Sequence, residues 1–166
     1  MTHEDLPLKV QWYNDPDVRK TLILDEVFEL EKTIQWFEAI KNCDSRQDLT
    51  IETDSARPIG MISLVNIDPK QKTAEIVLVI GDKDYWGKGV MFEAESLLIR
   101  HAFEKMGIEK IWAQTRPENI ASLITMKKLG FRIEGTLRKE TIVAGRRIDI
   151  IHLGVLPEDF KPAKHS

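Results

Sequence analysis

The segment of residues 73–106 constrains the fold most, because it runs from an apolar stretch through a glycine turn into a helical pattern. Its first part, "TAEIVLVI", is apolar at successive positions and predicts a central strand covered on both faces. In the following turn, "DYWGKG", Gly87 and Gly89 let backbone N–H groups face an anion at the start of a helix. That helix is predicted over residues 89–106, and Gly107 ends it. The layout predicts a phosphate-binding loop, although a lone G-x-G also suits an ordinary tight turn.

This glycine pattern differs from the two common nucleotide-binding motifs. No G-K-[ST] follows, so it is not a Walker loop, and the third glycine of a Rossmann fingerprint would fall on Phe92. Met91 and Phe92 also add bulk just past the second glycine, where a close phosphate favours small residues. A nucleotide-phosphate binder is one alternative, although no Ser or Thr that could bind Mg²⁺ follows Lys88.

The remaining patterns predict a single domain of the α+β (mixed α/β) class. The first third is helical, and its last helix places Leu30, Ile34, Phe37 and Ile40 on one face. Strands follow, and the helix over residues 89–106 and one over residues 117–128 lie between them, an order that excludes a doubly wound sheet. The predicted strands cover residues 49–53, 58–67, 73–80, 110–115, 131–140 and 146–156. We expect the domain to span residues 1–156 and residues 157–166 to form a loose tail.

Composition narrows the possible partners. The 166 residues contain 24 Lys and Arg against 27 Asp and Glu, a net charge of -3, so no attraction to nucleic acid or to an anionic membrane is expected. Cys43 is the single cysteine, and no Cys/His cluster has metal-ligand spacing. The N-terminus has no signal-peptide pattern, and no apolar run reaches ~18 residues. A cytoplasmic protein without metal is the prediction.

Four fragments in this order go beyond a generic fold pattern: "WYNDPDVRK", "AEIVLVIGDKDYWGKG", "FEAESLLIRHAF" and "PENIASLITMKKLGFRIEGTLRKE". From about Glu4 to Leu156 the chain resembles the GNAT superfamily of acetyl-CoA-dependent N-acetyltransferases. Within this superfamily it is most similar to the branch of ribosomal-protein N-terminal and polyamine acetyltransferases. The resemblance implies a mostly antiparallel, V-shaped sheet with helices on both faces. Because "THEDLP" begins where that family has just completed its first strand, this strand is expected to be missing. Residues 49–53 would then form an exposed edge or a homodimer seam.

The resemblance also implies which residues bind acetyl-CoA. The pyrophosphate loop of the family falls on Trp86, Gly87, Lys88, Gly89, Val90 and Met91. The preceding strand would bind the pantetheine arm through Leu78, Val79 and Ile80, and Asn119 would contact CoA further along. Three positions depart from the family: Trp86 replaces Gln or Arg, Met91 replaces Gly or Ala, and Met126 falls where many members carry a tyrosine that protonates the leaving thiolate.

Three residues are candidates for the proton transfers. By resemblance, Ser122 and Glu140 match the acid and base proposed for the ribosomal-protein branch. Glu75 is a second candidate base, because it shares a strand face with Val77 and Val79 and could face a cleft between splayed strands. Each has a simpler explanation as well: a solvated strand residue for Glu75, a helix-capping serine for Ser122, and a surface salt bridge for Glu140.

We therefore expect an N-acetyltransferase in which a primary amine attacks acetyl-CoA directly in a ternary complex. The acceptor could be a protein N-terminus, a polyamine or an amino sugar. Acidic residues on the early helices, namely Asp17, Asp25, Glu26 and Glu29, would suit a cationic acceptor, although solvated helices carry such charges without that reason. The alternative is a degenerate member that binds CoA or regulates without turnover.

Overall fold

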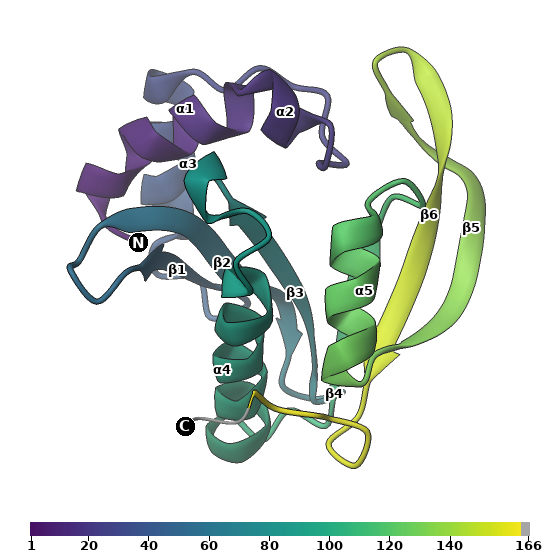
Figure 1. Ribbon diagram of the computed structural model, residues 1–166. Coiled ribbons are helices and arrows are strands. Elements are labelled where there is room, and N and C mark those ends of the chain that lie inside the picture. Colours follow the sequence, from purple (N-terminus) through teal and green to yellow (C-terminus); the bar gives the residue numbers. More distant parts are fainter. Residues whose placement is uncertain (164–166) are drawn as a thin grey trace.

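The computed structural model describes residues 1–163, and its element order is the predicted one: helices, a meander of strands, then alternating helices and strands (Figure 1). Its elements are η1 (His3–Asp5), α1 (Leu6–Asn14), α2 (Pro16–Arg19), α3 (Leu30–Ile40), β1 (Gln47–Glu52), β2 (Pro58–Asp68), β3 (Thr73–Ile80), η2 (Lys83–Tyr85), α4 (Val90–Lys105), β4 (Lys110–Thr115), α5 (Ile120–Leu129), β5 (Arg132–Val143) and β6 (Arg146–Val155).

The strands form one six-stranded sheet in the order β1-β2-β3-β4-β6-β5. Every neighbouring pair is antiparallel except β3 and β4, which run parallel. The predicted mostly antiparallel α+β fold is thereby confirmed. Within residues 1–163 no strand precedes β1, and β1 lies at an edge of the sheet.

The sheet opens between its two central strands. β3 and β4 pair only through Thr73, Ala74 and Glu75, although β3 continues to Ile80 and β4 to Thr115. Beyond Glu75 the strands diverge, so β1, β2 and β3 form one arm of a V and β4, β6 and β5 the other (Figure 1). Backbone groups that face the gap have no partner strand there, and a ligand can satisfy them.

Helices cover both faces of the first arm. On one face, Ile62, Leu64, Ala74 and Ile76 belong to the main core together with buried residues of α4 and α5. On the other face, Met61 and Val79 pack against Trp12, Tyr13, Val18 and Leu22 of the N-terminal segment. The strand predicted to be covered on both faces is only partly covered, because Val77 is 39% exposed and borders the opening between the arms.

The apolar face predicted for the last early helix is only partly buried. Leu30 and Ile34 of α3 are exposed, because this helix turns Thr33 inward instead. In α4, the buried stripe runs through Glu95, Leu98, Ile99 and Ala102.

The tail expected to be loose packs against the core as far as residue 163. Phe160 contacts Phe103 with ring centroids 5.7 Å apart, and the Ala163 N–H donates to the Ser96 hydroxyl at 2.7 Å. Residues 164–166 of this predicted tail lie outside the described part.

Candidate functional site

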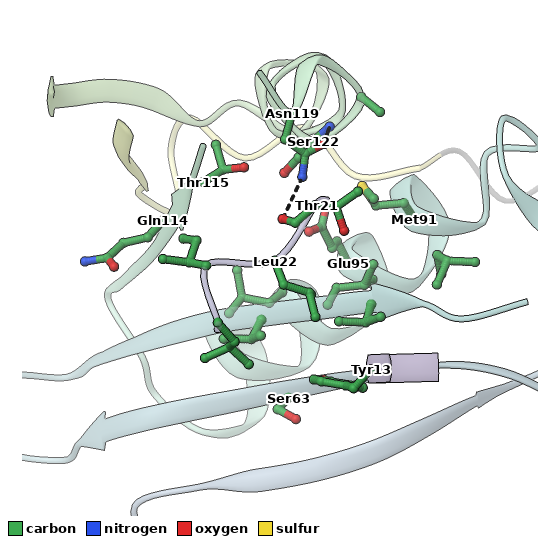
Figure 2. Close-up of a pocket in the computed structure, with 18 of the residues that line it drawn as sticks. Tyr13, Thr21, Leu22, Ser63, Met91, Glu95, Gln114, Thr115, Asn119 and Ser122 are labelled. Carbon is green, nitrogen blue, oxygen red and sulfur yellow. Dashed lines mark hydrogen bonds between the residues drawn. The ribbon is translucent and has the colours of Figure 1, made fainter. Parts of the chain in front are cut away.

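A cavity of about 1020 Å³ occupies the opening between the two arms of the sheet. Its walls come from the N-terminal helices and the segment after them, from β3, from the glycine turn with the start of α4, and from α5 (Figure 2). Of the site residues predicted from the sequence, all except Lys88 and Glu140 line it. A volume of this size accommodates a large co-substrate together with a smaller acceptor.

The glycine turn has the conformation that its sequence predicts. Gly87 and Gly89 have φ angles of +73° and +82°, and Gly89 is the N-cap of α4. A side chain at either position would meet nothing within 4 Å, so the glycines serve the backbone conformation and leave open space above the turn. The first backbone N–H groups of α4 have no partner inside the helix, and the positive end of its dipole favours an anion.

Trp86 closes one side of this turn. Its indole N–H donates to the Ile80 carbonyl at 2.8 Å, which holds the ring beside the end of β3. The side chain remains 40% exposed and lines the cavity. The residue that replaces the usual Gln or Arg therefore has a structural role here, and the Ile80 carbonyl already accepts one hydrogen bond.

Two residues of α4 border the cavity one turn apart. Met91 is partly buried and lines the cavity near the glycine turn, while Glu95 follows four residues later on the same helix face (Figure 2). Glu95 is only 2% exposed, and its Oε2 atom has no hydrogen-bond partner. Burial away from water raises the pKa of its carboxyl to about 8. Glu95 was not among the predicted site residues, although its spacing from Leu98 and Ile99 was a signal of burial.

Glu75 lies where the two arms meet. It is the last residue of β3 that pairs with β4, and its carboxylate accepts a hydrogen bond from the Asn66 amide at 2.7 Å. Partial burial raises its pKa, while the Asn66 hydrogen bond opposes this effect. A carboxylate whose pKa is raised accepts a proton more readily near neutral pH.

Ser122 and Asn119 lie at the start of α5. Asn119 caps this helix through the Ser122 N–H at 3.2 Å, and its amide contacts the Thr21 carbonyl at 3.5 Å (Figure 2). Ser122 is buried, and its hydroxyl lies 3.8 Å from the sulfur of Met126, a weak acceptor. The Ser122 proton is therefore free to turn toward a stronger acceptor in the cavity.

Glu140 lies away from this cavity. It is an exposed residue of β5 beside Lys139, where a positive φ of 53° marks an irregularity in the pairing with β6. Lys88 is exposed as well, with its ammonium 5.4 Å from the Tyr85 ring centroid. The structure therefore does not bring Glu140 to the other candidates, whereas Lys88 belongs to the glycine turn but does not line the cavity.

The opposite wall of the cavity combines two cations with aromatic rings. The Lys9 ammonium lies 3.9 Å from the ring centroid of Tyr13 and 4.9 Å from that of Trp36. Burial lowers the pKa of Lys9 to about 8. Arg46 forms two hydrogen bonds with Asp48, at 2.6 and 2.8 Å. Of the aromatic residues on the early helices, Trp12 and Tyr13 are buried, while Trp36 and Phe37 are partly buried.

Other site types receive no support from the described residues. Within residues 1–163, no three His, Cys, Asp or Glu side chains are grouped so that they could hold a metal ion. Among the helices of the same range, none is long and apolar enough to cross a membrane.

Comparison with known proteins identifies the family. The family described as "Acetyltransferase (GNAT) domain" matches residues 1–132. The chain is 28% identical to the uncharacterized N-acetyltransferase p20 of Bacillus licheniformis, over 96% of this chain and 92% of that protein. It is 31% identical to the putative ribosomal N-acetyltransferase YdaF of Bacillus subtilis (strain 168), over 63% of this chain and 57% of the relative.

A solved structure agrees in fold. The spermidine N-acetyltransferase from Vibrio cholerae, crystallised with CoA and spermine, superposes with a TM-score of 0.90 at 18% identity, over 96% of this chain and 94% of the other. The resemblance found in the four sequence fragments is thus confirmed by an independent match over most of the chain. This chain belongs to the GNAT family of acetyl-CoA-dependent N-acetyltransferases.

Proposed function

We propose that this protein transfers the acetyl group of acetyl-CoA to a primary amine by direct attack within a ternary complex. One observation supports this most strongly: a single cavity joins the glycine turn at the start of α4 with Glu75, where the two arms meet, and with Ser122 at the start of α5. Such a cavity accommodates co-substrate and acceptor together. A relative crystallised with both CoA and spermine supports the same arrangement.

In the proposed mechanism the amine nitrogen attacks the thioester carbonyl, and the C–S bond breaks to release the CoA thiolate. An alkylammonium with a pKa near ~10.4 costs roughly 4–5 kcal/mol to deprotonate at pH 7, so a base contributes substantially. Glu75 takes this proton directly or through water, and its raised pKa suits the task. Ser122 donates a hydrogen bond to the sulfur as charge develops there, in the place of the absent tyrosine.

The glycine turn holds the pyrophosphate in this proposal. Backbone N–H groups of Val90 and Met91 point out of the first turn of α4, and Gly87 and Gly89 keep side chains away from the anion. Leu78 and Val79 offer backbone groups along the open edge of β3, where the pantetheine arm would extend the sheet. Asn119 borders the same cavity.

The test combines turnover with binding. Purified protein is incubated with acetyl-CoA and a panel of peptide N-termini, polyamines and amino sugars, and acetylated products are identified by mass spectrometry. A parallel thermal shift measures binding, because a ligand at 100 times its dissociation constant stabilises by about 2.7 kcal/mol. Acetyl transfer to at least one amine is expected. Binding of acetyl-CoA without any product would instead support the second candidate, a CoA-binding module whose Met91 and Met126 have ended catalysis.

A further inference from the structure

Lys9 is an unusual component of the cavity wall. It is only 8% exposed, yet it lines the cavity from α1. Its ammonium contacts the faces of Tyr13 and Trp36, which stabilise a cation only in part. Within residues 1–163, no carboxylate oxygen lies within 4.0 Å of the Lys9 ammonium nitrogen, the distance that defines an ion pair. Among the described residues, no side-chain oxygen accepts a hydrogen bond from the Lys9 ammonium, which leaves its protons to the cavity.

The neighbouring charges do not neutralise Lys9. Arg46 and Asp48 form a bidentate pair, and the second oxygen contact of Asp48 goes to the Ser63 hydroxyl at 2.7 Å. The buried Lys9 and the partly buried pair of Arg46 and Asp48 thus carry one excess positive charge together. Glu26 also lines the cavity, but it is exposed, and water screens its charge.

The strand register relates Lys9 to the reacting centre. Asp48, which raises the pKa of Lys9, pairs with Ser63 on β2, and Ser63 pairs with Val77 on β3. Because alternate residues of a strand share a face, Glu75 lies on the same face as Val77. Two strand spacings separate Asp48 from β3, on the order of 10 Å. The excess positive charge and the proposed base therefore border one cavity, separated by the length of a small molecule.

We propose that Lys9 binds an anionic group, a carboxylate or a phosphate, that the acceptor carries several bonds away from its reacting amine. The proposal rests on the proposed function and names its substrate class. An anion at Lys9 completes the hydrogen bonds of the ammonium and neutralises the excess charge. A polyamine would instead place a second ammonium beside Lys9, and the two like charges would repel each other. The acceptor class therefore differs from that in the name of the Vibrio cholerae relative.

The experiment compares matched acceptors on the full-length protein. A series of ω-aminoalkanoates of increasing length is tested against the diamines of the same length, with kcat/KM measured from CoA thiol release. A second pair, an amino sugar phosphate and the same sugar without phosphate, distinguishes a phosphate from a carboxylate. We expect the anionic member of at least one pair to be preferred by about ten- to a hundredfold. Equal rates, or faster acetylation of the diamines, would overturn the proposal.

Two variants test the residue itself. Lys9→Met removes the charge but keeps an unbranched side chain of similar length. It should abolish the preference for the anionic acceptor by lowering kcat/KM for that acceptor, with little change for the uncharged one. Lys20→Met removes the same charge from an exposed lysine that pairs with Asp17, and it should keep the preference. A preference unchanged in Lys9→Met would contradict the assignment.

A binding measurement separates this proposal from the acetyltransferase proposal. With CoA present, the thermal stabilisation of the wild type by an ω-aminoalkanoate should exceed that by the matched diamine, whether or not acetyl transfer occurs. Turnover without any anion preference would refute the role of Lys9 alone, whereas anion binding without acetylation of any amine would refute the reaction alone.

Discussion

Replacing Glu95 with Gln should stabilise the folded protein, and increasingly so as the pH rises. Glu95 is buried in α4 without a partner for Oε2, and burial raises its pKa from 4.5 to about 8. In the unfolded chain the carboxyl ionises near 4.5, so between these two values the unfolded state releases a proton that the folded state keeps. Stability therefore falls with rising pH by about 1.4 kcal/mol for each pH unit across this window.

The magnitude follows from the same two pKa values. Gln resembles the protonated carboxyl in shape and polarity, so the desolvation of the neutral group nearly cancels in the comparison. The difference in the free energy of unfolding between Glu95→Gln and wild type should be under about 1 kcal/mol at pH 5. It should reach about 3 kcal/mol at pH 7 and nearly 5 kcal/mol above pH 8.5.

Urea denaturation of both proteins at several pH values between 5 and 9 measures this difference. Glu93→Gln is the control, because Glu93 is exposed on the same helix and its replacement should shift stability by less than about 1 kcal/mol at every pH. A difference between Glu95→Gln and wild type that stays constant from pH 5 to pH 9 would refute the reasoning, since it would show that Glu95 ionises alike in both states.

Three further outcomes are expected from the site. Glu75→Gln should lower kcat by about 10²- to 10⁴-fold and abolish the rise of rate with pH that the raised pKa of Glu75 produces. Glu140→Gln, outside the cavity, should leave both kcat and the pH dependence unchanged. The reverse pattern in the pH–rate profiles would make Glu140 the base. Met91→Ala should tighten CoA binding in calorimetry, since the shorter side chain clears space beside the pyrophosphate, and a weaker affinity would mean that the methionine contacts CoA favourably. Gly89→Ala forces a side chain into a φ of +82° and should cost about 1–2 kcal/mol in chemical denaturation; a loss near zero would show that the turn relaxes easily.

Local patterns predict much of this fold. The alternation and apolar runs of β3 and β4 match the observed strands residue for residue, because a strand buried in a sheet leaves a continuous apolar signature. Gly87, Gly89 and Gly107 mark chain turns correctly, since positive φ angles are open to glycine at little cost. The order of the elements and the glycine turn are thus encoded within short stretches of chain.

Long-range packing determines the remainder. In the sequence, Glu140 is as good a candidate base as Glu75. The pairing of β5 with β6, which the sequence does not reveal, places Glu140 outside the cavity. Glu95 and Lys9 read as ordinary helix charges, and they become buried because other helices and strands close over them. Desolvation depends on those distant neighbours, so the pKa values near 8 of Glu95 and Lys9 arise only in the assembled tertiary structure.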